Sequence, residues 1–113
     1  MSAKSRRKGI AGEREVAARM ESAGWEVRGL EGGGDWLAFR HRQEVFGGID
    51  MPLPSWVAHV EVKRYHDRAR FPEWWEQAVS EAIVGVRPLL CTRADRGEWL
   101  VTLRLDDLLE MVS

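Results

Sequence analysis

The sequence contains one cysteine, Cys91, among 113 residues, and it has no long run of apolar residues. A single cysteine excludes an internal disulfide framework and any zinc cluster built from cysteines. No apolar stretch approaches the ~20 residues that a membrane-spanning helix requires. We therefore expect a protein that has no disulfide framework and that does not cross a membrane.

The chain also lacks an excess of charge of either sign, because 17 basic residues face 18 acidic ones and leave a formal net charge of -1. A partner that binds through bulk positive charge is therefore not expected, and any affinity for nucleic acid has to come from local clusters. Lysine is scarce as well, since only Lys4, Lys8 and Lys63 are lysines and the other basic residues are arginines. This scarcity makes Lys63 stand out.

Two local clusters of positive charge are present. One lies in the first eight residues and comprises Lys4, Arg6, Arg7 and Lys8; the other comprises Lys63, Arg64, Arg68 and Arg70, opposed only by Asp67. Residues 9–13, which follow the first cluster, lack the apolar core of a signal peptide, so we expect a cytoplasmic protein. The length fits a single domain over residues 1–113, in which residues 1–8 form a basic arm that we expect to be flexible.

The hydrophobic pattern predicts an α/β domain in which helices flank a mixed sheet. Apolar residues recur at the helical period in three segments, and alternation or short apolar runs predict strands in several others. A long loop or irregular hairpin is expected over residues 29–48, followed by a short strand or turn around Asp50. The predicted order is α-β-β-β-α-β-β-α, with helices near 5–23, 71–84 and 105–112 and the clearest strands near 25–28, 56–64, 88–92 and 98–103.

Glu13 lies on the apolar side of the first predicted helix, three residues after Ile10 and four before Ala17. A lone carboxylate in such a position costs several kcal/mol unless it is paired or bound to a metal. An ordinary explanation also fits, in which Glu13 reaches water at the rim of the apolar stripe or pairs with Arg14 or Arg19. The pattern alone leaves both explanations open.

Glu61 and Lys63 flank Val62 in the strand predicted over residues 56–64. A spacing of two places both side chains on one side of that strand, ~7 Å apart, while the opposite side is purely apolar. This arrangement fits either the solvated face of an amphipathic strand or a pair of reactive groups.

Asp50 stands between two apolar residues, directly after Gly47 and Gly48 and eleven residues before Glu61. If its short strand paired with the strand of Glu61, the two carboxylates would come together and repel each other unless a cation neutralised them. Mg²⁺ or Mn²⁺ is the natural counter-ion for a few carboxylates. Asp50 is equally acceptable as an ordinary turn residue, because glycine-rich loops favour aspartate.

The ordered set formed by Glu13, Asp50 and the tripeptide 61–63 (Glu-Val-Lys) resembles the PD-(D/E)xK nuclease superfamily. More narrowly, residues 8–15 (KGIAGERE) resemble the opening helix of archaeal and phage-type Holliday junction resolvases, in which a short basic segment leads into a G-x-x-x-E-R-E-like helix start. The similarity covers most of the chain. It implies a restriction-endonuclease-like fold.

The resemblance also implies a role for each residue of the set. Asp50 and Glu61 would ligate a divalent metal, Mg²⁺ with Mn²⁺ as a substitute, helped by the backbone carbonyl of Val62. Glu13 would complete this site directly or through water, and Lys63 would orient or deprotonate the attacking water or stabilise charge on the scissile phosphate. Asp35, which ends the glycine-containing loop 31–35, is a rival for Asp50; the family usually has a serine in this loop and this chain has none. We favour Asp50 because of its distance in sequence from Glu61.

The implied substrate is branched DNA, and the implied activity is the resolution of four-way junctions by a homodimer. Such an enzyme would be phage-encoded or cellular and would act in DNA recombination and repair. Alternatives are another small nuclease of the superfamily, of repair or restriction type, or a non-catalytic DNA-binding subunit with the same fold. Phosphate contacts are expected from Arg6, Arg7, Lys8, Arg64, Arg68 and Arg70, and supporting roles near the site from His59 and Gln77.

Overall fold

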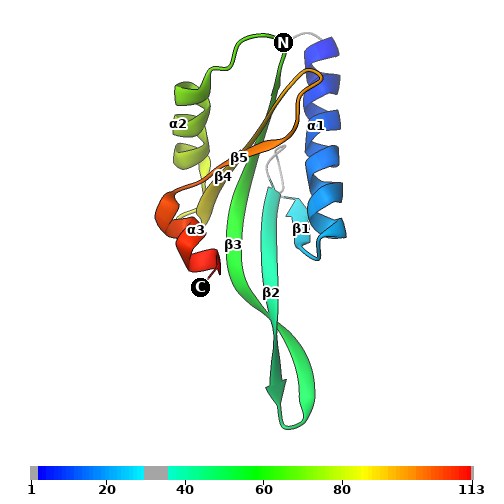
Figure 1. Ribbon diagram of the computed structural model, residues 1–113, viewed down its shortest axis with the longest axis vertical. Coiled ribbons are helices and arrows are strands. Elements are labelled where there is room, and N and C mark those ends of the chain that lie inside the picture. The colour runs from blue at the N-terminus through cyan, green and yellow to red at the C-terminus, as the bar shows by residue number, and fades with distance from the viewer. Residues whose placement is uncertain (1–2, 30–35, 113) are drawn as a thin grey trace.

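The computed structural model describes the backbone of residues 3–29 and 36–112 and the side chains of residues 9–29, 36–41, 47–49 and 56–112. Figure 1 shows the chain order, which agrees roughly with the predicted α-β-β-β-α-β-β-α sequence of elements, although the second strand lies at residues 36–46 and not around Asp50. The fold is α/β and consistent with a restriction-endonuclease-like architecture. The elements are α1 (Ala3–Ser22), β1 (Glu26–Gly29), β2 (Trp36–Phe46), β3 (Ile49–Tyr65), α2 (Phe71–Glu81), β4 (Arg87–Ala94), β5 (Leu100–Thr102) and α3 (Leu105–Val112).

The five strands form one mixed sheet in the spatial order β1-β2-β3-β4-β5. Neighbouring strands are antiparallel except β3 and β4, which are parallel and are connected through α2. A parallel pair needs a crossover of this kind because the chain has to return to the same end of the sheet. The strand β3 is therefore central, with β2 on one side and β4 on the other.

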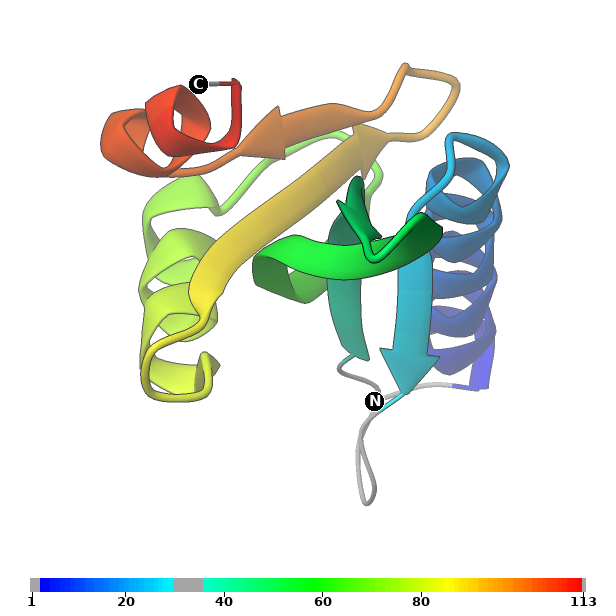
Figure 2. The ribbon, with the colours of Figure 1, turned by 90° about the horizontal axis from the view of Figure 1, so that it is seen from below.

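The two faces of β3 differ because successive side chains alternate between them. Trp56, Ala58 and Val60 belong to the main apolar core, together with Val16 of α1. His59 and Glu61 lie on the other face and are also buried, with exposures of 4% and 7%. Figure 2 shows α1 and α2 on opposite sides of the sheet, so both faces of β3 are covered by a helix.

Of the long loop or irregular hairpin expected over residues 29–48, the loop is wrong for residues 36–46, which form β2, while antiparallel pairing of β2 with β1 and β3 agrees with the hairpin. This strand and β3 make a long hairpin that projects from the body of the molecule (Figure 1) and turns at Gly47 and Gly48, whose φ angles are +58° and +84°. Residues 40–44 are all polar, so they lack the alternation of a half-buried strand. The reason is that this part of β2 pairs with β3 alone, beyond the end of β1.

The helix α2 ends at Glu81 instead of continuing to the predicted end at residue 84. Ala82 turns into an extended conformation (φ -61°, ψ 135°), and the backbone N–H of Ile83 donates a hydrogen bond to Nδ1 of His59 at 3.2 Å. The side chain of His59 thus accepts the hydrogen bond that the N–H of Ile83 would donate within α2 if the helix continued. Periodicity in the sequence cannot reveal this contact.

The single cysteine lies inside the core. Cys91 on β4 is 3% exposed, and burial raises the pKa of its thiol to about 12. At neutral pH the thiol therefore stays protonated and behaves as a small apolar side chain. None of the helices that the structure describes is long and apolar enough to cross a membrane.

Candidate active site

Glu61 and Lys63 form the centre of the candidate site. Both project from β3 toward the face covered by α2, and Nζ of Lys63 lies 3.4 Å from Oε1 of Glu61. The side chain of Glu61 is 9% exposed and that of Lys63 is 26% exposed. The ammonium group of Lys63 therefore reaches solvent, while the carboxylate of Glu61 stays buried. The positive charge of Lys63 balances the negative charge of this carboxylate at the edge of the core.

The surroundings of Glu61 are largely apolar. Leu90 of β4, opposite Glu61 in the parallel register, is completely buried, and Ala78 of α2 is 2% exposed. His59, two positions earlier on the same side of β3, accepts the hydrogen bond from Ile83 through Nδ1. Because Nδ1 is the acceptor, a neutral His59 carries its proton on Nε2. His59 thus fixes the end of α2 against the strand that bears Glu61.

Val62 and Arg64 point to the opposite face of β3. Val62 packs against the main core, while Nη2 of Arg64 lies 3.5 Å from Oδ1 of Asp95 at the end of β4. Asp95 also meets Nδ1 of His66 at 3.2 Å, and its backbone N–H donates to the carbonyl of Tyr65. These contacts hold the end of β3 against the turn that follows β4.

Glu13 is half-buried on α1, and the structure brings this helix close to β3 on the face opposite Glu61. The preceding residue, Gly12, lies against the side chain of Arg64, because a Cβ built on Gly12 would stand 2.9 Å from Cδ of Arg64. Arg64 follows Glu61 by three residues on β3. Glu13 lies near the same end of the strand as Glu61 but on the other side of the sheet.

The expected pairing of Asp50 with Glu61 is wrong. Residues 49–65 form one continuous strand, so Asp50 and Glu61 lie on the same strand instead of on neighbouring ones. Eleven residues of extended chain lie between them, a path of about 36 Å along the strand. Asp50 pairs with Val45 near the tip of the projecting hairpin, and its side chain is outside the described part.

The rival residue, Asp35, lies outside the described residues. Its neighbour in the chain, Trp36, is the first residue of β2 and pairs with Val60 of β3. Val60 immediately precedes Glu61. The described register of the hairpin thus ends one pair before the position of Glu61.

Glu61 supplies one oxygen donor of the kind that binds a hard divalent cation. The carboxylate of Glu61 offers oxygen ligands in a sheltered position, which is the ligand type that Mg²⁺ and Mn²⁺ prefer. Among the side chains that the structure describes (residues 9–29, 36–41, 47–49 and 56–112), however, no three His, Cys, Asp or Glu form a group that could hold a metal ion. Further oxygen ligands would therefore come from residues outside these ranges, from the backbone or from water.

The residues expected to contact DNA differ in their surroundings. Arg68 and Arg70 are exposed in the segment between β3 and α2, and neither has an ion-pair partner in the described part of the chain. Arg64 is engaged with Asp95. Arg6, Arg7 and Lys8 belong to the first turns of α1, and their side chains are not described. Gln77 donates to Oε1 of Glu81 at 3.1 Å, so the structure directs it along α2 instead of toward Glu61.

A polar network that sequence analysis missed ties α1 to β4. Arg93 donates from one nitrogen to both carboxylate oxygens of Glu15, at 2.9 and 3.0 Å, and the indole of Trp99 donates to Oε1 at 2.9 Å. The Trp99 hydrogen bond and the charge of Arg93 together lower the pKa of Glu15 below its usual 4.5. The partners of Glu15 are about 80 residues away in the sequence, so helical periodicity in α1 gives no signal for this contact.

Comparison with known proteins gives one match, which covers nearly the whole chain. Residues 4–113 match the family described as "Phage putative PDDEXK endonuclease". No curated protein and no solved structure matches the sequence or the fold.

Proposed function

Because the chain belongs to this phage PDDEXK endonuclease family, we propose that it hydrolyses DNA phosphodiester bonds with a divalent metal at the Glu61–Lys63 site. The observation that carries the proposal is the buried carboxylate of Glu61 with the Lys63 ammonium 3.4 Å away. A carboxylate and an amine on one face of a strand are the two groups that the E-x-K part of the family motif needs. PD-(D/E)xK nucleases in general use divalent metals. For this chain we propose Mg²⁺, with Mn²⁺ as a substitute.

Each residue of the pair has a distinct task in this proposal. Glu61 holds the cation, together with the backbone carbonyl of Val62. Lys63 is the more exposed of the two, so its ammonium can reach a phosphate and stabilise the negative charge that develops there, or orient the attacking water. The bound cation supplies Lewis-acid chemistry at the scissile phosphate. Glu13 is a supporting residue that acts from the opposite side of the sheet.

We propose Asp35, and not Asp50, as the second metal-binding carboxylate. In an antiparallel pair, each step along one strand corresponds to one step back along the other. Trp36 opposes Val60, the residue before Glu61. One further step of the same register would bring the residue before Trp36 opposite Glu61. Asp35 occupies that position in the sequence. The position of Asp50 on the same strand as Glu61, eleven residues away, supports this choice of Asp35.

The finer proposal concerns the substrate, which we take to be a four-way DNA junction cut by a homodimer. Its support is the resemblance of residues 8–15 to the opening helix of junction resolvases. A symmetric dimer also needs an apolar contact surface. Exposed apolar side chains lie on β5 and α3, namely Leu100, Val101, Leu105, Leu109 and Val112. The description of the matching family names no junction, which favours a small DNA nuclease of repair or restriction type as the second candidate.

The proposal is tested by incubating the purified full chain with Mg²⁺ and either a synthetic four-way junction or a linear duplex. Paired symmetric nicks in the junction alone would support resolution, and equal cutting of both substrates would support the second candidate. EDTA should stop cleavage in either case, and added Mg²⁺ should restore it. If neither substrate is cut in Mg²⁺ or when Mn²⁺ replaces it, the assignment of a nuclease would be overturned.

A further inference from the structure

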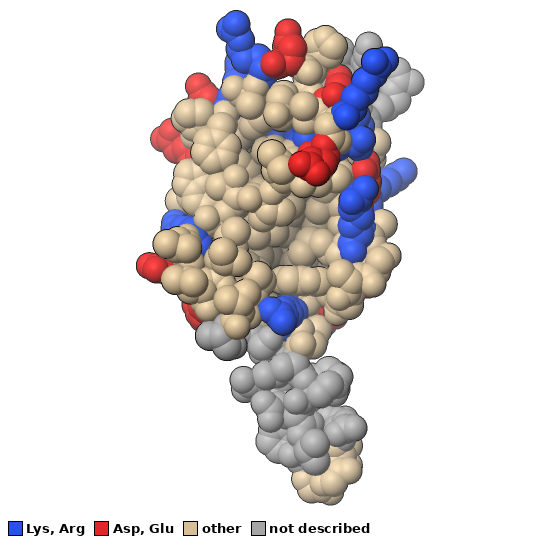
Figure 3. Space-filling model, viewed as in Figure 1, with Lys and Arg blue, Asp and Glu red and all other residues tan. Residues whose placement is uncertain are grey.

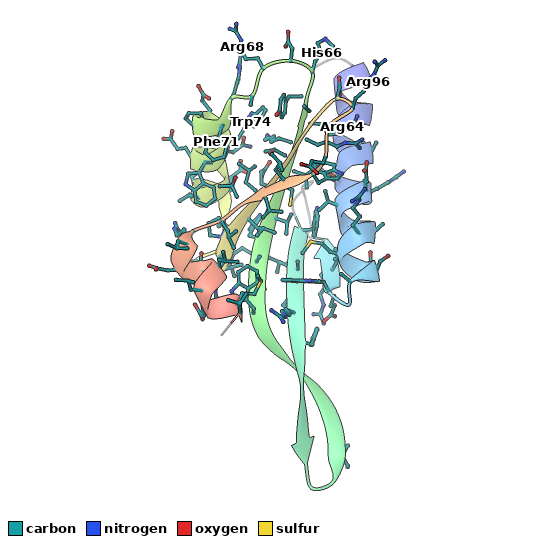
Figure 4. All side chains as sticks on the ribbon, in the orientation of Figure 1. Arg64, His66, Arg68, Phe71, Trp74 and Arg96 are labelled. Carbon is teal, nitrogen blue, oxygen red and sulfur yellow. The ribbon has the colours of Figure 1, made fainter. Side chains whose placement is uncertain are left out.

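An aromatic side chain is exposed shortly after two arginines in the chain, at the end of the molecule that carries the candidate site. Phe71, the first residue of α2, is 42% exposed, and Arg70 directly precedes it. Figure 4 shows Arg68, Phe71 and Trp74 at the same end as Arg64, His66 and Arg96. These residues come from the end of β3, the start of α2 and the turn after β4.

A line of side chains joins this surface to the candidate site. Tyr65 follows Lys63 by two positions on β3, so both lie on the same side of the strand, ~7 Å apart. The ring of Tyr65 lies 5.5 Å from that of Trp74, centroid to centroid, at a tilt of 47°. Phe71 precedes Trp74 by three residues and therefore lies next to it on the surface of α2. The side chains of Tyr65, Trp74 and Phe71 therefore lead from Lys63 to the solvent-exposed surface of α2.

The charges around Phe71 are too balanced to bind duplex DNA strongly by themselves. Arg68 and Arg70 are accompanied in sequence by Asp67 and Glu73. Figure 3 shows Lys and Arg side chains close to Asp and Glu side chains at this end of the molecule. Phosphate contacts give an affinity that grows with the number of cations, so two arginines beside two acids supply little. An additional source of binding energy is needed, and the exposed ring can provide it.

We propose that Phe71, flanked by Arg68 and Arg70, is a stacking site for an unpaired DNA base, so that the enzyme prefers DNA with a single-stranded segment next to the cut. This inference rests on the proposed function and specifies its substrate class. The face of a base is covered by its neighbours inside a duplex and becomes available only when the strand is unpaired. An exposed aromatic ring stacks on such a base whatever its identity, and nearby cations hold the adjoining phosphates.

The test measures binding without cleavage. Fluorescence anisotropy in EDTA gives the Kd of the full chain for a short labelled thymidine oligonucleotide and for a blunt duplex of the same length. Phe71→Leu keeps an apolar side chain but removes the ring, and it should weaken oligonucleotide binding by about tenfold. Phe71→Trp, which keeps a ring, should restore it. Ile83→Ala is the matched control, because Ile83 is 43% exposed just beyond the other end of α2, and it should bind both DNAs as the wild type does.

Two outcomes would overturn the inference. One is an oligonucleotide Kd that Phe71→Leu leaves unchanged; the other is an equal loss for the oligonucleotide and the duplex, which would make Phe71 a general contact. Cleavage is scored separately in Mg²⁺. A wild type that cuts DNA while Phe71→Leu binds the oligonucleotide normally refutes the stacking site and keeps the nuclease. A wild type that cuts nothing but binds the oligonucleotide through Phe71 refutes the nuclease and keeps the stacking site.

Discussion

Gly12 of α1 lies against the side chain of Arg64 on β3. A Cβ built on Gly12 would stand 2.9 Å from Cδ and 3.1 Å from Cγ of Arg64, and 3.4 Å from the ring of Trp99. The absence of a side chain at this position lets the helix approach the strand that carries Glu61 and Lys63. Gly12 thus leaves room for the side chain of Arg64 between α1 and β3.

We expect Gly12→Leu to destabilise the protein and Gly9→Ala to stabilise it. A leucine at position 12 has to displace Arg64 and Trp99, which should lower the free energy of unfolding by about 1–3 kcal/mol. A Cβ on Gly9 meets nothing within 4 Å, so Gly9→Ala gains helix propensity, about 0.5–1 kcal/mol. Urea denaturation measures both values. Equal stability of Gly12→Leu and the wild type would show that α1 does not approach β3 this closely.

Lys63→Met should abolish cleavage without abolishing DNA binding. Removal of the ammonium takes away charge stabilisation at the phosphate, and a loss of about 100-fold or more in the cleavage rate is expected. The rate is measured with excess enzyme in Mg²⁺, and binding by anisotropy in EDTA. Arg104→Met is the control, because Arg104 is half exposed and lies just before α3, remote in sequence from the pair on β3. A Lys63→Met protein that folds and still cuts at the wild-type rate would exclude a catalytic role for Lys63.

Asp35→Asn and Asp50→Asn should behave differently. We expect Asp35→Asn to lose cleavage by about 100-fold or more, because asparagine keeps the size of the side chain and removes the charge that a divalent cation needs. Asp50→Asn should cut at nearly the wild-type rate, since Asp50 lies about 36 Å along the strand from Glu61. The same cleavage assay compares the two variants. Loss of cleavage in Asp50→Asn together with wild-type cleavage in Asp35→Asn would identify Asp50, and not Asp35, as the metal-binding carboxylate.

Acid should remove the stabilisation that Glu15 supplies. Its pKa in the folded protein is lowered, first by the hydrogen bond from Trp99 and then by the charge of Arg93, so the ionised form favours folding. This contribution is complete above the usual pKa of 4.5 and is lost as the pH falls through the lowered value. Glu15→Gln should therefore be less stable than the wild type at neutral pH, and the two stability curves should converge in acid. Curves that stay parallel down to the lowest pH would show that Glu15 gains nothing from its partners in the folded state.

The sequence predicted the elements of the fold but not the geometry of the hairpin. The three helices and most of the strands follow from hydrophobic periodicity, whereas β2 does not. The alternation around Val62 correctly placed Glu61 and Lys63 on one side of a central strand. The extent of β3 was underestimated because its first residues carry no alternating pattern. They include Pro52 and Pro54, which strands ordinarily avoid.

That underestimate explains the preference for Asp50. A strand beginning at residue 56 leaves Asp50 free to sit on a neighbouring strand, whereas a strand beginning at residue 49 carries Asp50 and Glu61 in one line. Distance in sequence was the only guide, and it cannot distinguish a turn from a continuous strand. Polar contacts between distant elements, such as Glu15 with Arg93, were also beyond reach, because no local pattern encodes them.

The burial of the chain's single thiol makes site-specific labelling straightforward. Since Cys91 stays protonated and is covered by the core, a maleimide reagent should leave the folded wild type unmodified. A cysteine introduced at exposed Ile49, near the tip of the hairpin, would then be the one group to react. Spin labels or fluorophores attached there could report whether two protomers approach each other on a DNA substrate, with no native cysteine to replace first.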